Sequence, residues 1–324
     1  MQRPVPRAID PTAIVELRGV RKSFRQKQPA ACLRDALRPR YRHVTALDDV
    51  SFTVAPGAFV AYAGPNGAGK STTIKLLGGL LMQDAGEISV LGLSPDRHRI
   101  PIMRRMGILF GNRTELWWDH PVSTSYQWKR SVWDIPAGDF AAMEALVLDL
   151  LDIRPFYHTF ARELSLGQRM RADLGMLLLH RPDLLLLDEP TLGLDVLAKR
   201  QMIAFLKNLN ARQGTTVIVT SHDMDDLEEM ARRVLLIAQG RVAFDGDFTG
   251  LRQALGCTRR ATVRFADGTT RDYPFENAKE LMARLAALDD IADIAFGQTS
   301  LEEGLATLFA SWKRGEGTSL AAPD

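Results

Sequence analysis

One segment, residues 64–72, constrains the fold of this chain more than any other part of it. Its pattern is G-x-x-x-x-G-K-[ST], a loop whose backbone N–H groups surround nucleotide phosphates. The short apolar run Phe59–Ala63 precedes the loop and is typical of a buried strand, whereas Ile74, Leu77 and Leu81 follow it at helical spacing. The sequence therefore predicts a strand–loop–helix unit that binds a nucleoside triphosphate.

The residue types of this loop suit phosphate chemistry. Glycines allow a tight turn with the N–H groups pointing inward, and the helix that starts near Lys70 adds the positive end of its dipole. Lys70 is expected to reach the β- and γ-phosphates, and the Ser71 hydroxyl to ligate Mg²⁺. The alternative is a purely structural glycine turn before a helix. The predicted phosphate-binding residues are Gly64, Pro65, Asn66, Gly67, Ala68, Gly69, Lys70, Ser71 and Thr72.

Composition limits the class of protein. A chain of 324 residues can bury one large core and a smaller appended unit, and 46% hydrophobic residues are ordinary for a globular protein. The formal net charge of +2 is too small to indicate nucleic acid as a general partner. Cys32 and Cys257 form no disulfide or zinc pattern, which favours a reducing compartment. We find no signal peptide and no apolar run near the roughly 18 residues that cross a bilayer, so spanning helices would come from a partner.

A second chemical feature is an apolar strand, residues 184–187, that ends in Asp188 and Glu189. Parallel α/β folds place their ligands at the carboxyl ends of strands. Asp188 is suited to holding Mg²⁺ through its water shell, and Glu189 to activating the attacking water as a general base. The alternative is a pair of acids that cap a helix.

Apolar strands that alternate with helices predict an α/β fold: a P-loop NTPase core with a mostly parallel sheet covered on both faces, and an antiparallel β subdomain. We expect a flexible N-terminus at residues 1–12, a nucleotide-binding domain at 13–255, and a small α+β accessory domain at 256–324. The nucleotide-binding domain contains a basic insertion at 25–43 and a helical subdomain at about 112–180.

The expected elements follow apolar periodicity and turn residues. Hairpin turns are expected at Gln239-Gly240 and Asp267-Gly268. Further strands are expected at 13–17, 19–24, 45–54, 87–91, 216–220, 234–238, 241–244, 260–265, 270–275 and 291–295, and helices at 31–37, 141–151, 170–179, 276–288 and 300–309.

Three features leave alternatives open. The insertion is either a solvated loop or a basic arm against anionic lipid headgroups or a partner. Four of the five tryptophans fall between residues 117 and 133, and they belong either to the core or to an interface. The C-terminal domain carries no catalytic motif, so a stabilising or dimerising role is expected. The residues concerned are Arg25, Lys27, Arg34, Arg38, Arg40 and Arg42 in the insertion, and Trp117, Trp118, Trp128 and Trp133.

A second anion site is predicted at the segment Leu164-Ser165-Leu166-Gly167-Gln168, which precedes an apolar-periodic helix. Ser165 is a favourable N-cap, Gly167 permits close backbone approach, and a helix N-terminus binds anions. One chain does not need two sites for one γ-phosphate. We therefore expect this site to serve the nucleotide of a neighbouring subunit.

Over residues 13–250 these motifs, in this order, resemble the ATP-binding cassette (ABC) ATPases. The segment at 164–168 matches the signature L-S-G-G-Q, with Leu166 in place of the first glycine, and Gly193-Leu194-Asp195 matches the D-loop. Asn112 stands where the family has a glutamine that links metal and lytic water, and it is one methylene shorter. The resemblance implies nucleotide contacts from Phe24, Asn112, Ser165, Gly167, Gln168 and Asp195, metal contacts from Ser71, Asp188 and Asn112, and catalytic roles for Lys70, Glu189 and His222.

The resemblance also implies ATP and Mg²⁺ as cofactors, and a second ABC subunit, identical or paralogous, that closes head to tail with this one. Its other partners would be integral membrane permease subunits, at the cytoplasmic face of the cell membrane, with no nucleic acid. The insertion and the segments 116–119 and 221–226 are similar to a bacterial exporter branch with separately encoded permeases, some for drug or viologen export. The alternatives are a soluble ABC ATPase acting on ribosomes or DNA, and a weakly hydrolysing regulator.

Overall fold

A computed structural model describes residues 13–27, 41–111, 113–257, 259–275, 277–298 and 300–313. The chain divides into two compact units, Met1–Asp245 and Gly246–Asp324, and each is described by itself. Asn112, Cys32, the predicted flexible N-terminus and the helix expected at 31–37 lie outside the described residues.

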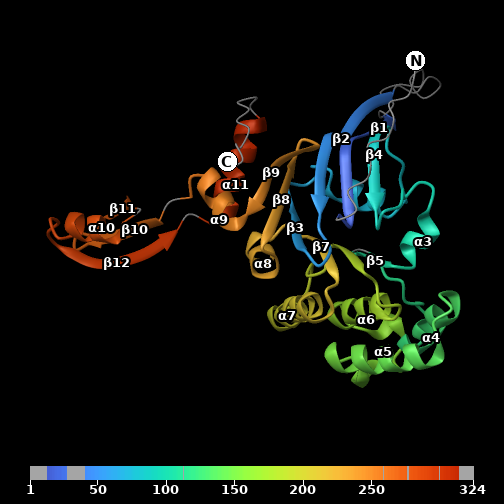
Figure 1. Ribbon diagram of the computed structural model, residues 1–324. Helices are drawn as coiled ribbons and strands as arrows, with labels where there is room; N and C mark the ends of the chain where they lie inside the picture. Colours follow the sequence, from blue (N-terminus) through green and yellow to red (C-terminus); the bar gives the residue numbers. More distant parts are fainter. Residues whose placement is uncertain are drawn as a thin grey trace, which may run out of the picture. The chain divides into compact units, whose positions relative to one another are not determined.

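The first unit is built on a six-stranded sheet (Figure 1). In spatial order its strands are β5 (Met106–Phe110), β6 (Leu184–Asp188), β7 (Thr216–Thr220), β3 (Phe59–Ala63), β8 (Arg233–Ala238) and β9 (Arg241–Asp247). The first five of these strands, from β5 to β8 in spatial order, pair in parallel with their neighbours. The predicted hairpin is present. Gln239 and Gly240 form the turn that connects β8 to β9, and their φ angles are 49° and 76°. The sheet is therefore mixed at one edge, and β5 is a strand that the sequence analysis did not predict.

A three-stranded antiparallel sheet forms the predicted β subdomain, in the order β2 (Tyr41–Val54), β1 (Val15–Lys27) and β4 (Ala85–Val90). The pairing of β1 with β2 continues to Lys27 opposite Tyr41. Residues 25–27 and 41–43 are thus strand ends, and the prediction that they belong to the insertion was wrong. Backbone pairing and the Arg25 guanidinium, which lies 4.7 Å from the Tyr41 ring centroid, hold the two ends together.

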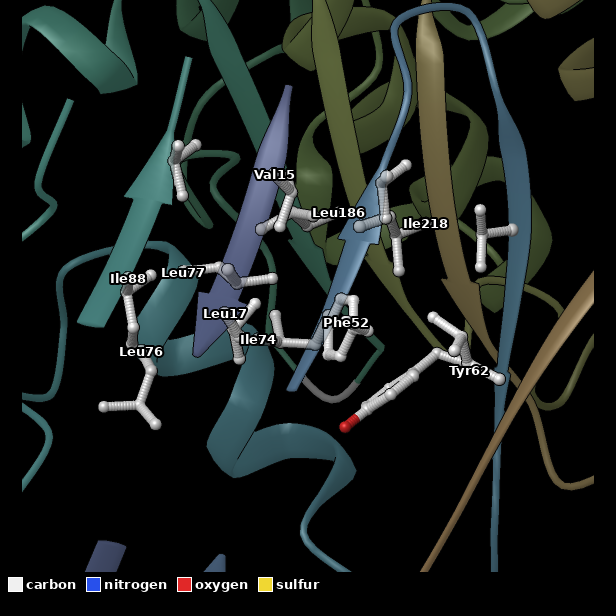
Figure 2. Packing of buried hydrophobic residues seen from close by; sticks show 14 of the residues in the cluster. Val15, Leu17, Phe52, Tyr62, Ile74, Leu76, Leu77, Ile88, Leu186 and Ile218 are labelled. Atoms are coloured by element: carbon white, nitrogen blue, oxygen red, sulfur yellow. The ribbon is translucent and has the colours of Figure 1, made fainter. Parts of the chain in front are cut away.

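The main core lies between this small sheet, the large sheet and helix α2 (Lys70–Leu77) (Figure 2). Side chains from all three meet there: Val15, Leu17, Phe52 and Ile88 from the small sheet, Ile74, Leu76 and Leu77 from α2, and Tyr62, Leu186 and Ile218 from the large sheet. The apolar strands β6 and β7 are buried along their length, as their continuous apolar runs predict. This packing fixes α2, and with it the start of the helix at Lys70, against the sheet.

Helices connect and cover the strands of the first unit. Between β5 and β6 lie α4 (Val122–Val132), α5 (Ala137–Leu150), the short helices Arg154–Phe156 and Ala161–Glu163, and α6 (Leu166–Leu178); Figure 1 shows α4, α5 and α6 gathered together. The other helices are α3 (Arg99–Met103) before β5, α7 (Val196–Gln213) after β6 and α8 (Met224–Met230) after β7. In the described part of the chain no helix is long and apolar enough to span a membrane.

The tryptophans in this helical region do not form a core. Trp117, Trp118 and Trp128 are 38%, 49% and 37% exposed, and Trp133 is half-buried. Helix α4 turns other residues inward, including Val122 and the fully buried Tyr126, whereas Trp128 lies on its more exposed side and Trp117 and Trp118 lie on the preceding loop. The core interpretation was therefore wrong, and the interface interpretation stays a prediction.

The second unit contains a small antiparallel sheet. Its elements are α9 (Phe248–Ala254), β10 (Arg259–Phe265), β11 (Thr270–Phe275), α10 (Ala278–Leu285), β12 (Ile291–Gln298) and α11 (Leu301–Lys313), and the strand order is β11-β10-β12. Ala261, Val263, Leu281 and Leu285 form its core. The expected order of hairpin, helix, strand and helix is present.

Candidate functional site

The phosphate loop joins β3 to α2 in a conformation that requires glycine. Gly64 has a φ of 152°, and a Cβ atom there would lie 2.2 Å from the Ile237 carbonyl oxygen. Gly69, directly before α2, has a φ of 116°, and its Cβ would lie 2.7 Å from the Ala46 carbonyl oxygen. Neither position has space for a side chain, so the two glycines set the path of the loop.

This loop encloses a cavity of about 170 Å³. All of the predicted phosphate-binding residues except Gly64 and Ala68 line it, and Glu189 closes one side. The end of β6 therefore reaches the phosphate loop, as the sequence predicts. The lining residues are Ala46, Pro65, Asn66, Gly67, Gly69, Lys70, Ser71, Thr72 and Glu189.

Lys70 is 7% exposed and folds back into the loop. Its Nζ atom donates to the carbonyl oxygens of Gly64 at 2.6 Å and Pro65 at 3.2 Å. Burial lowers the pKa of Lys70, while the carboxylates of Glu189 and Asp188 act in the opposite direction. A phosphate oxygen is a better partner for this ammonium than a neutral carbonyl, because charge-assisted hydrogen bonds are stronger.

The neighbouring strand β7 holds the two acidic residues at the end of β6, Asp188 through its carboxylate and Glu189 through its backbone. The Glu189 N–H donates to Thr220 at two points, the carbonyl oxygen at 3.1 Å and Oγ1 at 3.0 Å. The Thr220 hydroxyl in turn donates to Asp188 Oδ1 at 2.7 Å. His222 Nδ1 lies 3.6 Å from Glu189 Oε2, so the structure brings together two of the three residues for which the resemblance implies catalytic roles.

Thr220 is the site residue that the sequence analysis missed. It ends the predicted strand at 216–220, and it pairs in register with Asp188. The sequence contained a signal for this contact, because Thr220 and Asp188 each end an apolar strand of one parallel sheet.

The oxygen donors at this site fit Mg²⁺. Ser71 lines the cavity, and the Asp188 carboxylate is close enough to Lys70 to act on its pKa. Among the described residues, no group of three or more His, Cys, Asp or Glu side chains could hold a metal by itself. Mg²⁺ is commonly held by one or two protein oxygens together with substrate phosphates and water, which matches this donor set. Asn112, the third predicted ligand, lies outside the described residues.

Phe24 lies on β1 opposite Val44, with its ring 38% exposed. Two residues further along β2, Ala46 lines the phosphate cavity. A strand advances about 3.3 Å per residue, so Val44, the partner of Phe24, lies roughly 7 Å along β2 from Ala46. The adenine contact of Phe24 stays a prediction.

The signature residues form a helix cap. Ser165 is the N-cap of α6, as predicted: its Oγ accepts from the Gln168 N–H at 3.2 Å, and Gln168 Oε1 accepts from the Ser165 N–H at 2.9 Å. Asp195 caps α7 through the Ala198 N–H at 2.8 Å. In the described part of the chain, the walls of the phosphate cavity include none of Ser165, Gly167, Gln168 and Asp195. Their nucleotide contacts stay predictions that concern a second subunit.

The signature segment packs against the D-loop. Gly193 has a φ of 73°, and a Cβ atom there would lie 2.6 Å from Leu166 Cδ2. Around this contact, Leu166, Leu192, Val196 and Leu197 are 43%, 44%, 70% and 67% exposed. These four side chains are named here the signature–D-loop surface.

A phosphate loop between a buried strand and a helix, with an acidic strand end beside it, defines a phosphate-loop nucleotide-binding protein. The family model described as ABC transporter matches residues 47–192. A phosphonates import ATP-binding protein of Nostoc is 33% identical over 64% of this chain and 87% of its own length. The linearmycin resistance ATP-binding protein LnrL of Bacillus subtilis is 31% identical over 68% of this chain and 70% of its own.

Other comparisons agree on the fold. A solved ATP-binding subunit of an ABC transporter superimposes with a TM-score of 0.62 at 22% identity, over 75% of this chain and 93% of that one. The chain covers 45%, 35% and 64% of the length of three other ABC transporter ATP-binding proteins that it resembles. The chain belongs to the ABC transporter family, among its ATP-binding subunits.

Proposed function

We propose that the chain binds MgATP in the phosphate loop and hydrolyses it, and that this drives a separate membrane permease. The observation that carries the proposal is the meeting of Lys70, Glu189 and His222 at one end of the sheet. Lys70 lies between loop and carboxylates, Glu189 lines the phosphate cavity, and His222 lies 3.6 Å from Glu189. Together they supply a cation, a base and a further γ-phosphate contact.

In this mechanism Lys70 exchanges its carbonyl partners for β- and γ-phosphate oxygens, and the loop N–H groups hold the same phosphates. Ser71 and Asp188 would hold Mg²⁺, which would neutralise charge at the phosphate oxygens. Glu189 orients the attacking water and accepts its proton. His222 positions the γ-phosphate. The contribution of the protein is thus positioning and electrostatic stabilisation.

The proposed site is completed by a second ABC subunit. Ser165 and Gly167 lie at the exposed start of α6, outside the walls of their own phosphate cavity. A head-to-tail pair would place this helix N-terminus against the γ-phosphate bound by the partner, which suits the dipole of α6. Closure around two MgATP would drive the permease, and hydrolysis would reopen the pair.

Hydrolysis is tested with the full chain and the substitution Glu189→Gln. The variant keeps the shape of the side chain but removes the base, so kcat should fall about 100-fold or more while MgATP binding is retained. Glu87→Gln, on β4, is the matched control and should hydrolyse ATP as the wild type does. Wild-type hydrolysis by Glu189→Gln, or no hydrolysis by the wild type even with its permease, would contradict the proposal.

For direction we propose export, with the chain held peripherally at the inner face of the membrane by its permease. The proposal rests on the likeness of segments 116–119 and 221–226 to the exporter branch. One relative is named for import and another for resistance, so the test must separate the two directions. Co-expression with the permease of a neighbouring gene should move the chain to the membrane fraction. ATP should then drive substrate into inside-out vesicles; uptake only into right-side-out vesicles, or a ribosome-bound pool, would contradict export.

A further inference from the structure

We infer that Thr220 is a positioning residue for the reaction, because its single hydroxyl binds the carboxylate of Asp188 and the backbone N–H of Glu189 at the end of β6. This inference rests on the proposed hydrolysis and adds a residue outside the family motifs named above. It concerns two distinct tasks: orienting the carboxylate of Asp188 and holding the backbone from which the Glu189 side chain extends.

The Thr220 hydroxyl has fully determined partners. Thr220 is 0% exposed and ends β7 directly opposite Asp188 in the parallel register. A hydroxyl has one proton and two lone pairs. The ionised carboxylate of Asp188 can only accept, so the proton goes to Oδ1 at 2.7 Å, and a lone pair receives the Glu189 N–H at 3.0 Å. Both uses are compatible, and together they leave the hydroxyl no freedom to rotate.

The contact to Glu189 supports an unusual backbone conformation. Glu189 has a φ of 56°, in the left-handed region that a residue with a Cβ atom seldom adopts. The same N–H also reaches the Thr220 carbonyl oxygen at 3.1 Å, so residue 220 holds this turn through two acceptors. The turn takes the chain off the line of β6 and places Glu189 in the cavity wall beside His222. Thr220 therefore determines where the base lies.

The contact to Asp188 gives its two carboxylate oxygens different roles. Oδ1 accepts the Thr220 proton, and this fixes the rotation of the carboxylate about its last bond. The other oxygen would then be the one available to Mg²⁺ or its water shell when the metal is bound. Partners that orient a metal ligand in this way typically contribute 10- to 100-fold to metal affinity.

The test compares Thr220→Val with Thr220→Ser and with a matched control on the same strand. Valine keeps the β-branched shape and removes only the hydroxyl, whereas serine restores it. Thr216 is also buried on β7 and accepts a hydrogen bond, from the Gly57 N–H at 2.8 Å, but it lies at the opposite end of the strand. Thr216→Val therefore reproduces the loss of a buried hydroxyl outside the site.

Two readouts separate positioning from a structural role. With Thr220→Val, kcat for ATP should fall about 10- to 100-fold, the loss expected when a hydrogen bond to a charged group is removed, with little change in KM. Mn²⁺ binding to the ADP complex, followed by electron paramagnetic resonance, should weaken by about 10-fold. Thr220→Ser should restore both values, and Thr216→Val should change neither. Thr220→Ala is the second hydroxyl-free variant if valine does not fold.

Wild-type kcat and Mn²⁺ affinity in the folded hydroxyl-free variants would overturn the inference, as would an equal kcat loss in Thr216→Val. This failure is distinguishable from failure of the proposed function. If Glu189→Gln abolishes hydrolysis while Thr220→Val does not, only the positioning role is lost. If Glu189→Gln hydrolyses ATP normally, the proposed function fails first.

Discussion

At the scale of single residues, His180 shows how burial sets the charge of a side chain far from the chemistry. Its ring stacks on Trp133 with the centroids 4.9 Å apart, and its Nε2 atom lies 3.2 Å from the Met106 carbonyl oxygen. Burial lowers the pKa of His180 to about 4, and the nearby Lys129 ammonium acts in the same direction. The imidazole is therefore neutral in the folded protein at neutral pH.

His180 should make the protein less stable in mild acid. In the unfolded chain the His180 imidazole is protonated below about pH 6.5, whereas in the folded chain it is protonated only below about pH 4. The free energy of unfolding therefore falls as pH drops through this window. Between pH 7 and pH 5 the loss should be about 2 kcal/mol. Urea unfolding of His180→Gln should lack this loss, whereas His158→Gln, at an exposed histidine, should retain it. Parallel pH profiles for all three proteins would contradict the prediction.

At the scale of elements, one lysine joins the start of α7 to the start of α8. Lys199 Nζ lies 2.6 Å from Asp223 Oδ2 and 2.7 Å from Asp226 Oδ1, and Thr191 Oγ1 donates to Asp226 Oδ2 at 3.1 Å. Asp223 is the N-cap of α8 and directly follows His222 in sequence. The D-loop helix and the segment that carries the histidine are thus tied to each other.

Lys199→Met should loosen this junction. The variant keeps the length of the side chain but leaves the carboxylate of Asp226, which is 8% exposed, with only the Thr191 partner. We expect the free energy of unfolding to fall by about 2 kcal/mol, below the value for a fully buried pair because Lys199 and Asp223 are partly exposed. Lys207→Met, on the exposed side of α7, is the control and should change stability by less than about 0.5 kcal/mol. Equal unfolding midpoints for the two variants would contradict the role of Lys199.

Elements with a local signal could be predicted, and those that depend on pairing could not. The strand Thr216–Thr220, the Gln239-Gly240 turn and the Ser165 cap follow from apolar runs and turn or cap chemistry within a few residues. The role of Thr220 depends instead on its register with Asp188, 32 residues earlier in the chain. The exposure of Trp128 likewise depends on which side α4 turns inward, and an aromatic cluster carries no periodic signal for that.

At the scale of the whole molecule, the four apolar side chains of the signature–D-loop surface are exposed on the first unit. Val196 and Leu197 begin α7 beside the Asp195 cap, and Leu166 begins α6 beside the Ser165 cap. Head-to-tail pairing would bring both helix starts to a partner's nucleotide, and the apolar side chains beside them would lose water in the same step. Burying such side chains contributes about 25 cal/mol per Å². The surface would therefore strengthen an ATP-dependent dimer.

The proposed dimer contact can be tested by placing one charged side chain in the signature–D-loop surface. In the Glu189→Gln background, which should retain bound MgATP, Val196→Glu would place a carboxylate in the closing surface, where desolvation without a partner is costly. Size-exclusion chromatography with light scattering should show a MgATP-dependent dimer for Glu189→Gln and a monomer for the double variant. Val132→Glu, at a residue of α4 that is 54% exposed, makes the same change elsewhere and should leave the dimer intact. Val196 does not line the phosphate cavity, so the ATP affinity of the monomer should stay unchanged. A dimer of normal strength in the Val196→Glu double variant would show that this surface is not part of the dimer contact.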